Sequence, residues 1–258
     1  MPPYIKHWLT TALVSCGLSA QAEVITAQPY DLHLSAYATL TLSTDMLAAF
    51  DIIKPSATPV GWATSPVTIQ TDPEGFYTNF QTTAPIQYLA FDDQNILGFR
   101  TTGGVTLTTS PIKVVSSGGS ITLTDLDFDL QSKTIYGKVS GDNGIGSIDH
   151  MALWNYTGLS GDTAVNGVSP KLLTLSNLQF TQEGFNAFAQ SLALSRVGYA
   201  VALGGMSNFG SVSVAISAPL EMGPPPGWYV GQVPEPSTYA LMGLGLVGLT
   251  LARRRQTS

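Results

Sequence analysis

The clearest structural signal in the chain is the stretch LHLSAYATLTL, residues 32–42, in which apolar and polar residues alternate. One face of this stretch would carry only leucine and alanine, and the other would carry histidine, serine, tyrosine and threonine. Because successive side chains of a strand point to opposite faces, this period of two predicts a long, half-buried β-strand.

Further short runs of the same type follow, separated by turn residues. The predicted strands lie at 60–69, 76–81, 86–91, 96–101, 105–109, 112–116, 120–124, 126–130, 134–140, 145–155, 171–180, 197–203 and 211–217. The step Gly141-Asp-Asn-Gly144 between two such runs predicts a tight hairpin. Many short strands at spacings of roughly 8–12 residues predict a mainly β fold, an antiparallel sandwich or a barrel.

Two short helices interrupt the strands, and their sequences match. Residues 43–50 and 181–188 each begin with a hydroxyl residue that suits a helix N-cap, carry an acid in the first turn and end on phenylalanine. Their apolar positions follow helical spacing and are Met46, Ala49, Phe50 and Ile53, then Phe185, Phe188, Ala189 and Leu192. The match predicts a strand–helix unit used twice, either as a duplicated half-domain or as two helices closing opposite ends of one sandwich.

The first 22 residues have the pattern of a secretory signal peptide. Lys6 supplies a weakly basic start, an apolar segment follows, and Ala20 and Ala22 form an A-x-A cleavage site. We therefore predict export through the Sec machinery. The only cysteine, Cys16, lies in this segment, so the mature chain would contain none. A lipoprotein box ending at Cys16 is the alternative interpretation.

The other end of the chain has three consecutive parts. A linker rich in proline and glycine, residues 218–233, precedes the tripeptide Pro234-Glu235-Pro236. Residues 238–252 contain no charge and are apolar on every side, which predicts a single transmembrane helix. At about 1.5 Å per residue it covers about 22 Å of a ~30 Å hydrocarbon layer, and Arg253, Arg254 and Arg255 would hold its end on the cytoplasmic side.

This tripartite tail, residues 234–258, resembles the PEP-CTERM sorting signal of Gram-negative bacteria. The resemblance implies that an exosortase, a membrane-embedded enzyme, recognises Pro234, Glu235 and Pro236 and processes the protein during export. It also implies an intermediate anchored in the inner membrane, a final place at the cell surface or in the extracellular matrix, and exopolysaccharide as a further partner. The motif is then a substrate for another enzyme.

The segment between the targeting sequences, residues 23–217, is predicted to be the β-rich extracellular domain. Lys6 and the three terminal arginines account for four of the 11 basic residues, and Glu235 for one of the 17 acidic residues. With Glu221 of the linker included, the remaining seven basic and 16 acidic residues of 23–233 give a charge near −9. An acidic surface of this kind argues against nucleic acid as a partner.

Three alternating carboxylates, Asp125, Asp127 and Asp129, are the strongest candidates for a metal site, because calcium binds several oxygen ligands. Leu130 and Tyr136 stand where an EF-hand needs glycine and glutamate, so a solvated strand face is the favoured interpretation. Asp142 and Asn143 in the glycine loop are a second weak calcium candidate. We predict no metal site and no bound cofactor.

Catalytic patterns are absent from the sequence. No G-x-S-x-G is present, and His33 and His150 lack the spacing of zinc ligands. The G-x-G-x-x-G text at residues 243–248 lies inside the apolar tail, where small residues favour helix packing. Aromatic residues that could stack on sugars are Trp62, Tyr77, Tyr88, Trp154, Tyr156, Trp228 and Tyr229, although core packing is the commoner role.

Together these features predict a non-catalytic, exported surface or matrix protein. The phrase at 173–192, with 119–154, resembles segments that recur in PEP-CTERM ectodomains, and it is similar to secreted haem-binding HtaA-like domains, with no ligand residue of that family matched here. The alternative function is a secreted module that binds haem, calcium or a glycan. A secreted hydrolase is the third.

Overall fold

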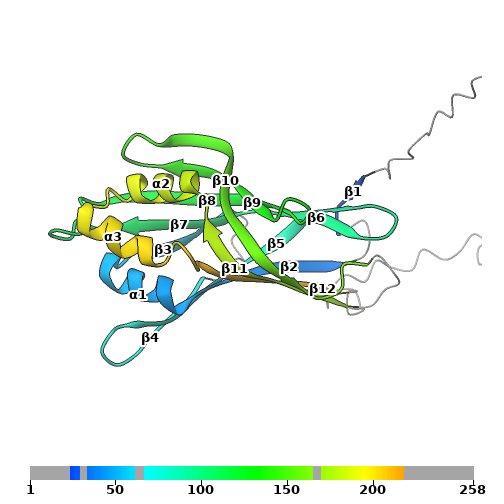
Figure 1. Cartoon of the computed structure of the whole chain (residues 1–258), viewed down its shortest axis with the longest axis horizontal. Coiled ribbons are helices and arrows are strands. Elements are labelled where there is room, and N and C mark those ends of the chain that lie inside the picture. Colours follow the sequence, from blue (N-terminus) through cyan, green and yellow to red (C-terminus); the bar gives the residue numbers. More distant parts are fainter. Residues whose placement is uncertain (1–23, 30–33, 62–66, 165–169, 218–258) are drawn as a thin grey trace, which may run out of the picture. The chain divides into compact units, whose positions relative to one another are not determined.

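The computed structural model describes residues 24–29, 34–61, 67–164 and 170–217, which form a closed antiparallel β-barrel with three helices (Figure 1). The mainly β prediction is confirmed, and of its two architectures the barrel is the observed one. The elements, in chain order, are β1 (Ile25–Ala27), β2 (Ser35–Leu42), α1 (Thr44–Ile53), β3 (Ser56–Val60), β4 (Val67–Thr71), β5 (Tyr77–Phe91), β6 (Ile96–Thr101), β7 (Gly104–Thr109), β8 (Gly119–Asp129), β9 (Thr134–Gly141), β10 (Gly146–Ser160), β11 (Lys171–Phe180), α2 (Gln182–Ser191), α3 (Arg196–Gly204) and β12 (Gly210–Ser217).

Eight strands close the barrel, in the order β5, β2, β12, β11, β10, β9, β8 and β6, and β6 pairs back onto β5. Every pairing is antiparallel, and each of the eight strands uses both of its edges. β7 and β3 extend the sheet from β8, while β4 and β1 pair with β5. Ring closure satisfies the backbone groups that an open sheet would expose at its edges.

The hairpin signal at residues 141–144 is confirmed. It connects β9 to β10, and Asn143 and Gly144 have φ values of 55° and 88°. This left-handed backbone is the reason that asparagine and glycine stand at the turn. Residues 120–124 and 126–130, predicted as two strands, form the single strand β8, whose register shifts between Thr124 and Asp127.

Both predicted helices are present with their predicted caps and buried stripes. The Ser43 hydroxyl accepts from the Met46 amide, and the Thr181 hydroxyl accepts from the Gly184 amide. The apolar stripes of both helices lie in the core. The helices gather at one end of the barrel (Figure 1), so their placement at opposite ends is wrong. The reason is that β2 and β11, which precede them, both pair antiparallel with β12 and therefore run in the same direction.

Residues 197–203, predicted as a strand, form most of a third helix, α3. The Ser195 hydroxyl caps it by accepting from the amides of Val197 and Gly198. Gly198 and Ala202 are its buried residues, four positions apart on one face, and a Cβ at Gly198 would collide with the Val115 carbonyl. The bulky residues of this segment alternate, and that pattern predicts a strand. The helix forms instead because close packing of its small residues, four positions apart, governs this segment.

Residues 112–116, also predicted as a strand, form a turn with one isolated bridge between Ile112 and Ser116. Val114 in this turn has a φ of 68°. The predicted strand at 60–69 is two separate strands in the described residues, since β3 ends at Val60 and β4 begins at Val67. In contrast, the runs at 76–81 and 86–91 join into the long strand β5.

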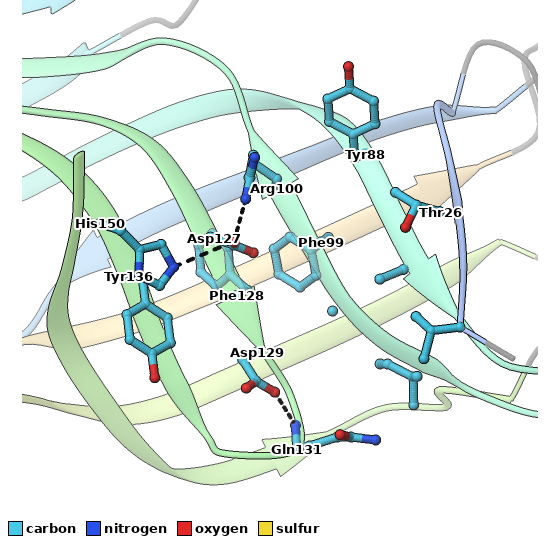
Figure 2. A pocket seen from close by; sticks show the side chains of 14 residues that line it. Thr26, Tyr88, Phe99, Arg100, Asp127, Phe128, Asp129, Gln131, Tyr136 and His150 are labelled. Carbon is cyan, nitrogen blue, oxygen red and sulfur yellow. Dashed lines mark hydrogen bonds and ion pairs between the residues drawn. The ribbon is translucent and has the colours of Figure 1, made fainter. Parts of the chain in front are cut away.

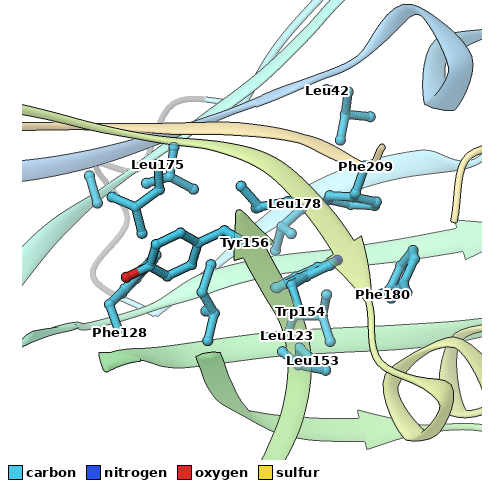
Figure 3. Close-up of a cluster of buried hydrophobic side chains, with 14 of the residues drawn as sticks. Leu42, Leu123, Phe128, Leu153, Trp154, Tyr156, Leu175, Leu178, Phe180 and Phe209 are labelled. Atoms are coloured by element: carbon cyan, nitrogen blue, oxygen red, sulfur yellow. The ribbon is translucent and has the colours of Figure 1, made fainter. Parts of the chain in front are cut away.

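The core fills the barrel and continues beneath the helices. Leu173, Leu175 and Val214 from β11 and β12 are fully buried, as the alternation of those strands predicts. Figure 3 shows the aromatic part of this core, where the Trp154 ring lies near the rings of Phe180 and Phe209.

Within the described ranges, no helix combines the length and apolarity that crossing a membrane needs. The predicted signal peptide (1–22), linker (218–233) and sorting tail (234–258) lie outside those ranges. The structure therefore does not test the signal peptide, the linker or the predicted membrane span at 238–252, which stay predictions.

Candidate functional site

A row of polar and aromatic side chains crosses five neighbouring strands on the outside of the barrel (Figure 2). Tyr88 of β5 pairs with Arg100 of β6, Arg100 pairs with Asp127 of β8, and Asp127 pairs with Tyr136 of β9. His150 of β10 continues the row, because it stacks on Tyr136. These five side chains, although far apart in the sequence, therefore form one row across the sheet.

Asp127 is the electrostatic centre of this row. Its Oδ2 accepts from Arg100 Nη2 at 2.7 Å and lies 4.0 Å from His150 Nε2. The hydrogen bond that Arg100 donates to Asp127, and the negative charge of that carboxylate, raise the pKa of Arg100 above its ordinary value. Both ion-pair partners remain partly exposed, so the pair orients the guanidinium and adds little to stability.

The Tyr136 ring is held by a parallel stack. Its centroid lies 4.3 Å from that of the His150 ring, with 16° between the planes. His150 reaches this position from an irregular part of β10, where the register against β9 shifts between Ile148 and Met151. A bulge of this kind re-aims a side chain, and here it places the imidazole over the phenol.

These residues line a groove of about 710 Å³, within the roughly 300–1,000 Å³ typical of ligand sites. Ala90 and Gly98, which are cross-strand partners, form its low floor. Thr26 of β1 and Val24, just before β1, line one side of the groove, and the row described above lines another. A Cβ at Gly98 would lie 2.5 Å from the Phe128 carbonyl oxygen, so glycine is required by the close approach of β8.

The three aspartates proposed as calcium ligands each accept from a different donor. Asp125, at φ 53° in the irregular part of β8, accepts from the Gly103 amide at 3.2 Å. Asp127 pairs with Arg100, and Asp129 binds the backbone amides at 131 and 132 in the turn that follows β8. In the part of the chain that the structure describes, no group of three or more acidic, histidine or cysteine side chains is arranged to hold a metal ion.

The second calcium candidate fastens the β9–β10 hairpin to a helix. The Asn143 side chain donates to the Ser191 carbonyl at 2.9 Å and to the Gly118 carbonyl at 3.3 Å. The Asp142 carboxylate accepts from the Ser120 hydroxyl at 2.7 Å. These contacts hold the end of α2 against the barrel, which is a structural role.

The predicted sugar-stacking residues are divided by the fold. Trp154 and Tyr156 are core residues, Tyr77 packs edge-on against Phe50, and only Tyr88 lines the groove. Trp62, Trp228 and Tyr229, together with His33, lie outside the described residues.

Sequence reasoning missed Arg100 and Tyr136, the two residues that join Tyr88, Asp127 and His150 into one site. Each stands alone in its own strand, and only the pairing of β5, β6, β8 and β9 brings them together. A cross-strand register is set by non-local pairing, so no local motif marked them.

Comparison with known proteins identifies the C-terminal tail. Residues 232–256 match the family model described as the PEP-CTERM protein-sorting motif, so the chain carries this motif, as its tail predicted. No curated protein matches the chain. Among solved structures, the chain is similar to the C-terminal domain of HtaA from Corynebacterium glutamicum, at 14% identity and a TM-score of 0.39, over 71% of this chain and 98% of that domain.

Proposed function

We propose that this protein is exported, held briefly in the inner membrane and processed by an exosortase, and that it then acts at the cell surface or in the extracellular matrix without an activity of its own. The observation that carries the proposal is the PEP-CTERM motif at residues 232–256. The signal-peptide pattern at residues 1–22 supports it independently, because a sorting tail acts only on a chain that enters the export pathway.

Each part of the tail has a physical role in this proposal. Pro234 and Pro236 lack backbone donors and would favour an extended chain, which a processing enzyme could reach. The apolar run at 238–252 would hold the intermediate in the bilayer, and the three terminal arginines would keep it from passing through. Sec machinery and exosortase are then the partners, with exopolysaccharide as a partner at the final location.

Processing is tested by intact-mass spectrometry of the mature protein from cells with and without the exosortase. We expect the chain from exosortase-positive cells to lack the apolar run and the chain from exosortase-negative cells to retain it. Glu235→Ala should reduce processing, while Glu221→Ala, which removes an acid outside the motif, should not. A tail that stays intact in both strains contradicts the proposal.

The arginine cluster gives a separate test of membrane orientation. Replacing Arg253, Arg254 and Arg255 with glutamate should release the carboxyl end to the far side of the membrane, and replacement with lysine should preserve the orientation. A cysteine introduced at Ser258 and labelled with an impermeant reagent reports its side. Identical labelling of the glutamate and lysine variants would disprove the role of the cluster.

The groove favours a second candidate function, a secreted ligand-binding module. It brings aromatic, cationic and anionic side chains from five strands around one open volume, which a purely structural barrel does not need. The test is a panel of three ligands added to the purified chain: haemin, followed by its Soret band; calcium, followed by the melting temperature; and oligosaccharides, followed by calorimetry. If none of the three ligands changes its readout, the structural role is the candidate function that remains.

A further inference from the structure

The groove on the outside of β5, β6, β8, β9 and β10 has a low floor between raised walls. Ala90 and Gly98 put no large side chain above the sheet, whereas Tyr88, Arg100 and Tyr136 rise beside them. The result is an open channel along the barrel surface. A channel that is open to solvent suits a chain-like ligand that enters from the side.

The walls combine two kinds of recognition group. Tyr88 and Tyr136 present aromatic rings, and the stack on His150 fixes the orientation of Tyr136. Arg100 and Asp127 present planar, paired donors and acceptors, whose relative position is fixed by their 2.7 Å contact. Because these groups are oriented before a ligand arrives, little ordering entropy is lost on binding.

The charge balance of the groove excludes some ligand classes. Arg100 is already neutralised by Asp127, and Asp129 adds a further negative charge to the lining. An anionic ligand such as a phosphate, or the carboxylate edge of a haem, would meet two carboxylates and no free cation among the described lining residues. A purely apolar ligand would bury the polar groups of the walls without partners.

We propose that this groove binds a neutral polysaccharide chain, with one pyranose ring packed on the face of Tyr136 that His150 does not cover. A pyranose presents an apolar C–H face that packs on an aromatic ring, and an edge of hydroxyls that both donate and accept hydrogen bonds. The Asp127 carboxylate accepts from one sugar hydroxyl, and the Arg100 guanidinium donates to the adjacent one. The side-chain amide of Gln131 supplies a second acceptor and donor at the far end of the groove. This assignment rests on the second candidate function and is independent of tail processing.

The test uses the full chain in a polyoxyethylene detergent, since sugar-headed detergents would compete. Calorimetric titrations use five neutral hexasaccharides: cellohexaose, maltohexaose, laminarihexaose, mannohexaose and xylohexaose. We expect at least one to bind, and we expect Tyr136→Ala and Arg100→Ala each to weaken binding about tenfold. Tyr37→Ala is the matched control, because Tyr37 is 51% exposed on β2 and does not line the groove.

A second variant protects the test against misfolding. His150, whose side chain is 59% exposed, can be replaced by alanine with little effect on the core, and this change should also weaken binding by releasing Tyr136. Failure of all five hexasaccharides to bind, or equal binding by the groove variants and the control, overturns the proposal. A haemin Soret band that disappears in Tyr136→Ala would assign the groove to haem, and binding of alginate in preference to the neutral sugars would also refute it.

Discussion

Replacing Trp154 by alanine should be among the most destabilising changes in the barrel. Its side chain is 1% exposed, and its ring centroid lies 4.9 Å from that of Phe209 and 5.6 Å from that of Phe180 (Figure 3). These contacts join β10 to β11 and to the segment that leads into β12. Trp154 of β10 therefore packs against two neighbouring segments of the barrel at once.

The magnitude follows from burial. A tryptophan buries up to about 250 Å², which at about 25 cal/mol per Å² gives an upper limit near 6 kcal/mol. Residual burial in the unfolded chain lowers this figure, and measured losses for such truncations are about 3–5 kcal/mol. We expect Trp154→Ala to lower the free energy of unfolding by about 4 kcal/mol.

Trp154→Phe separates packing from polarity. The indole Nε1 is buried and has no hydrogen-bond partner among the described residues, so it carries a desolvation cost of about 1–3 kcal/mol. Phenylalanine keeps an aromatic ring beside Phe180 and Phe209 and removes that N–H. We therefore expect Trp154→Phe to change the free energy of unfolding by less than about 1.5 kcal/mol.

Urea unfolding followed by circular dichroism measures both variants without relying on tryptophan fluorescence. With a denaturant slope of about 2 kcal/mol per molar, Trp154→Ala should lower the midpoint by about 2 M. Two results would refute the reasoning: a midpoint for Trp154→Ala within about 0.5 M of the parent chain, or an equal loss for Trp154→Phe.

Three further changes test the caps, the strand packing and the pH dependence. Thr181→Ala and Ser43→Ala should each lower the free energy of unfolding by about 1 kcal/mol or more, because each hydroxyl caps a helix and also donates to a backbone carbonyl outside that helix. Stability of either variant equal to that of the parent chain in urea would contradict this. Gly98→Ala should destabilise by several kcal/mol, since its Cβ would strike the β8 backbone, whereas Gly204→Ala, with open space around it, should change the melting temperature little. Burial, and then a nearby carboxylate, raise the pKa of Tyr156 to about 12 from the 10.0 of the unfolded chain, so the folded state favours the neutral phenol. The associated stability is complete below pH 10 and is lost as the pH rises from 10 to 12, so Tyr156→Phe should reduce this alkaline loss in urea midpoints; an identical loss in both proteins would argue against it.

Much of the secondary structure followed from local patterns. Alternation predicted the strands because a strand exposes one face and buries the other, and hydroxyl residues before apolar stripes predicted α1 and α2. The segment that became α3 was misread, because its bulky residues alternate while its small residues, Gly198 and Ala202, determine the packing. The candidate site was predicted only in part, since Tyr88, Asp127 and His150 were singled out without any indication that they meet.

The amino-acid sequence alone determined the mainly β class, the hairpin at residues 141–144 and the sorting tail, because each depends on residues close together along the chain. Only the tertiary structure decided that eight strands close into a barrel, that β2 and β11 deliver their helices to the same end, and that Arg100 and Tyr136 complete a groove. The physical reason is that strand order and register arise from pairings between segments far apart in sequence. A shift of one residue in one of these strands would turn the groove side chains of that strand to the opposite face.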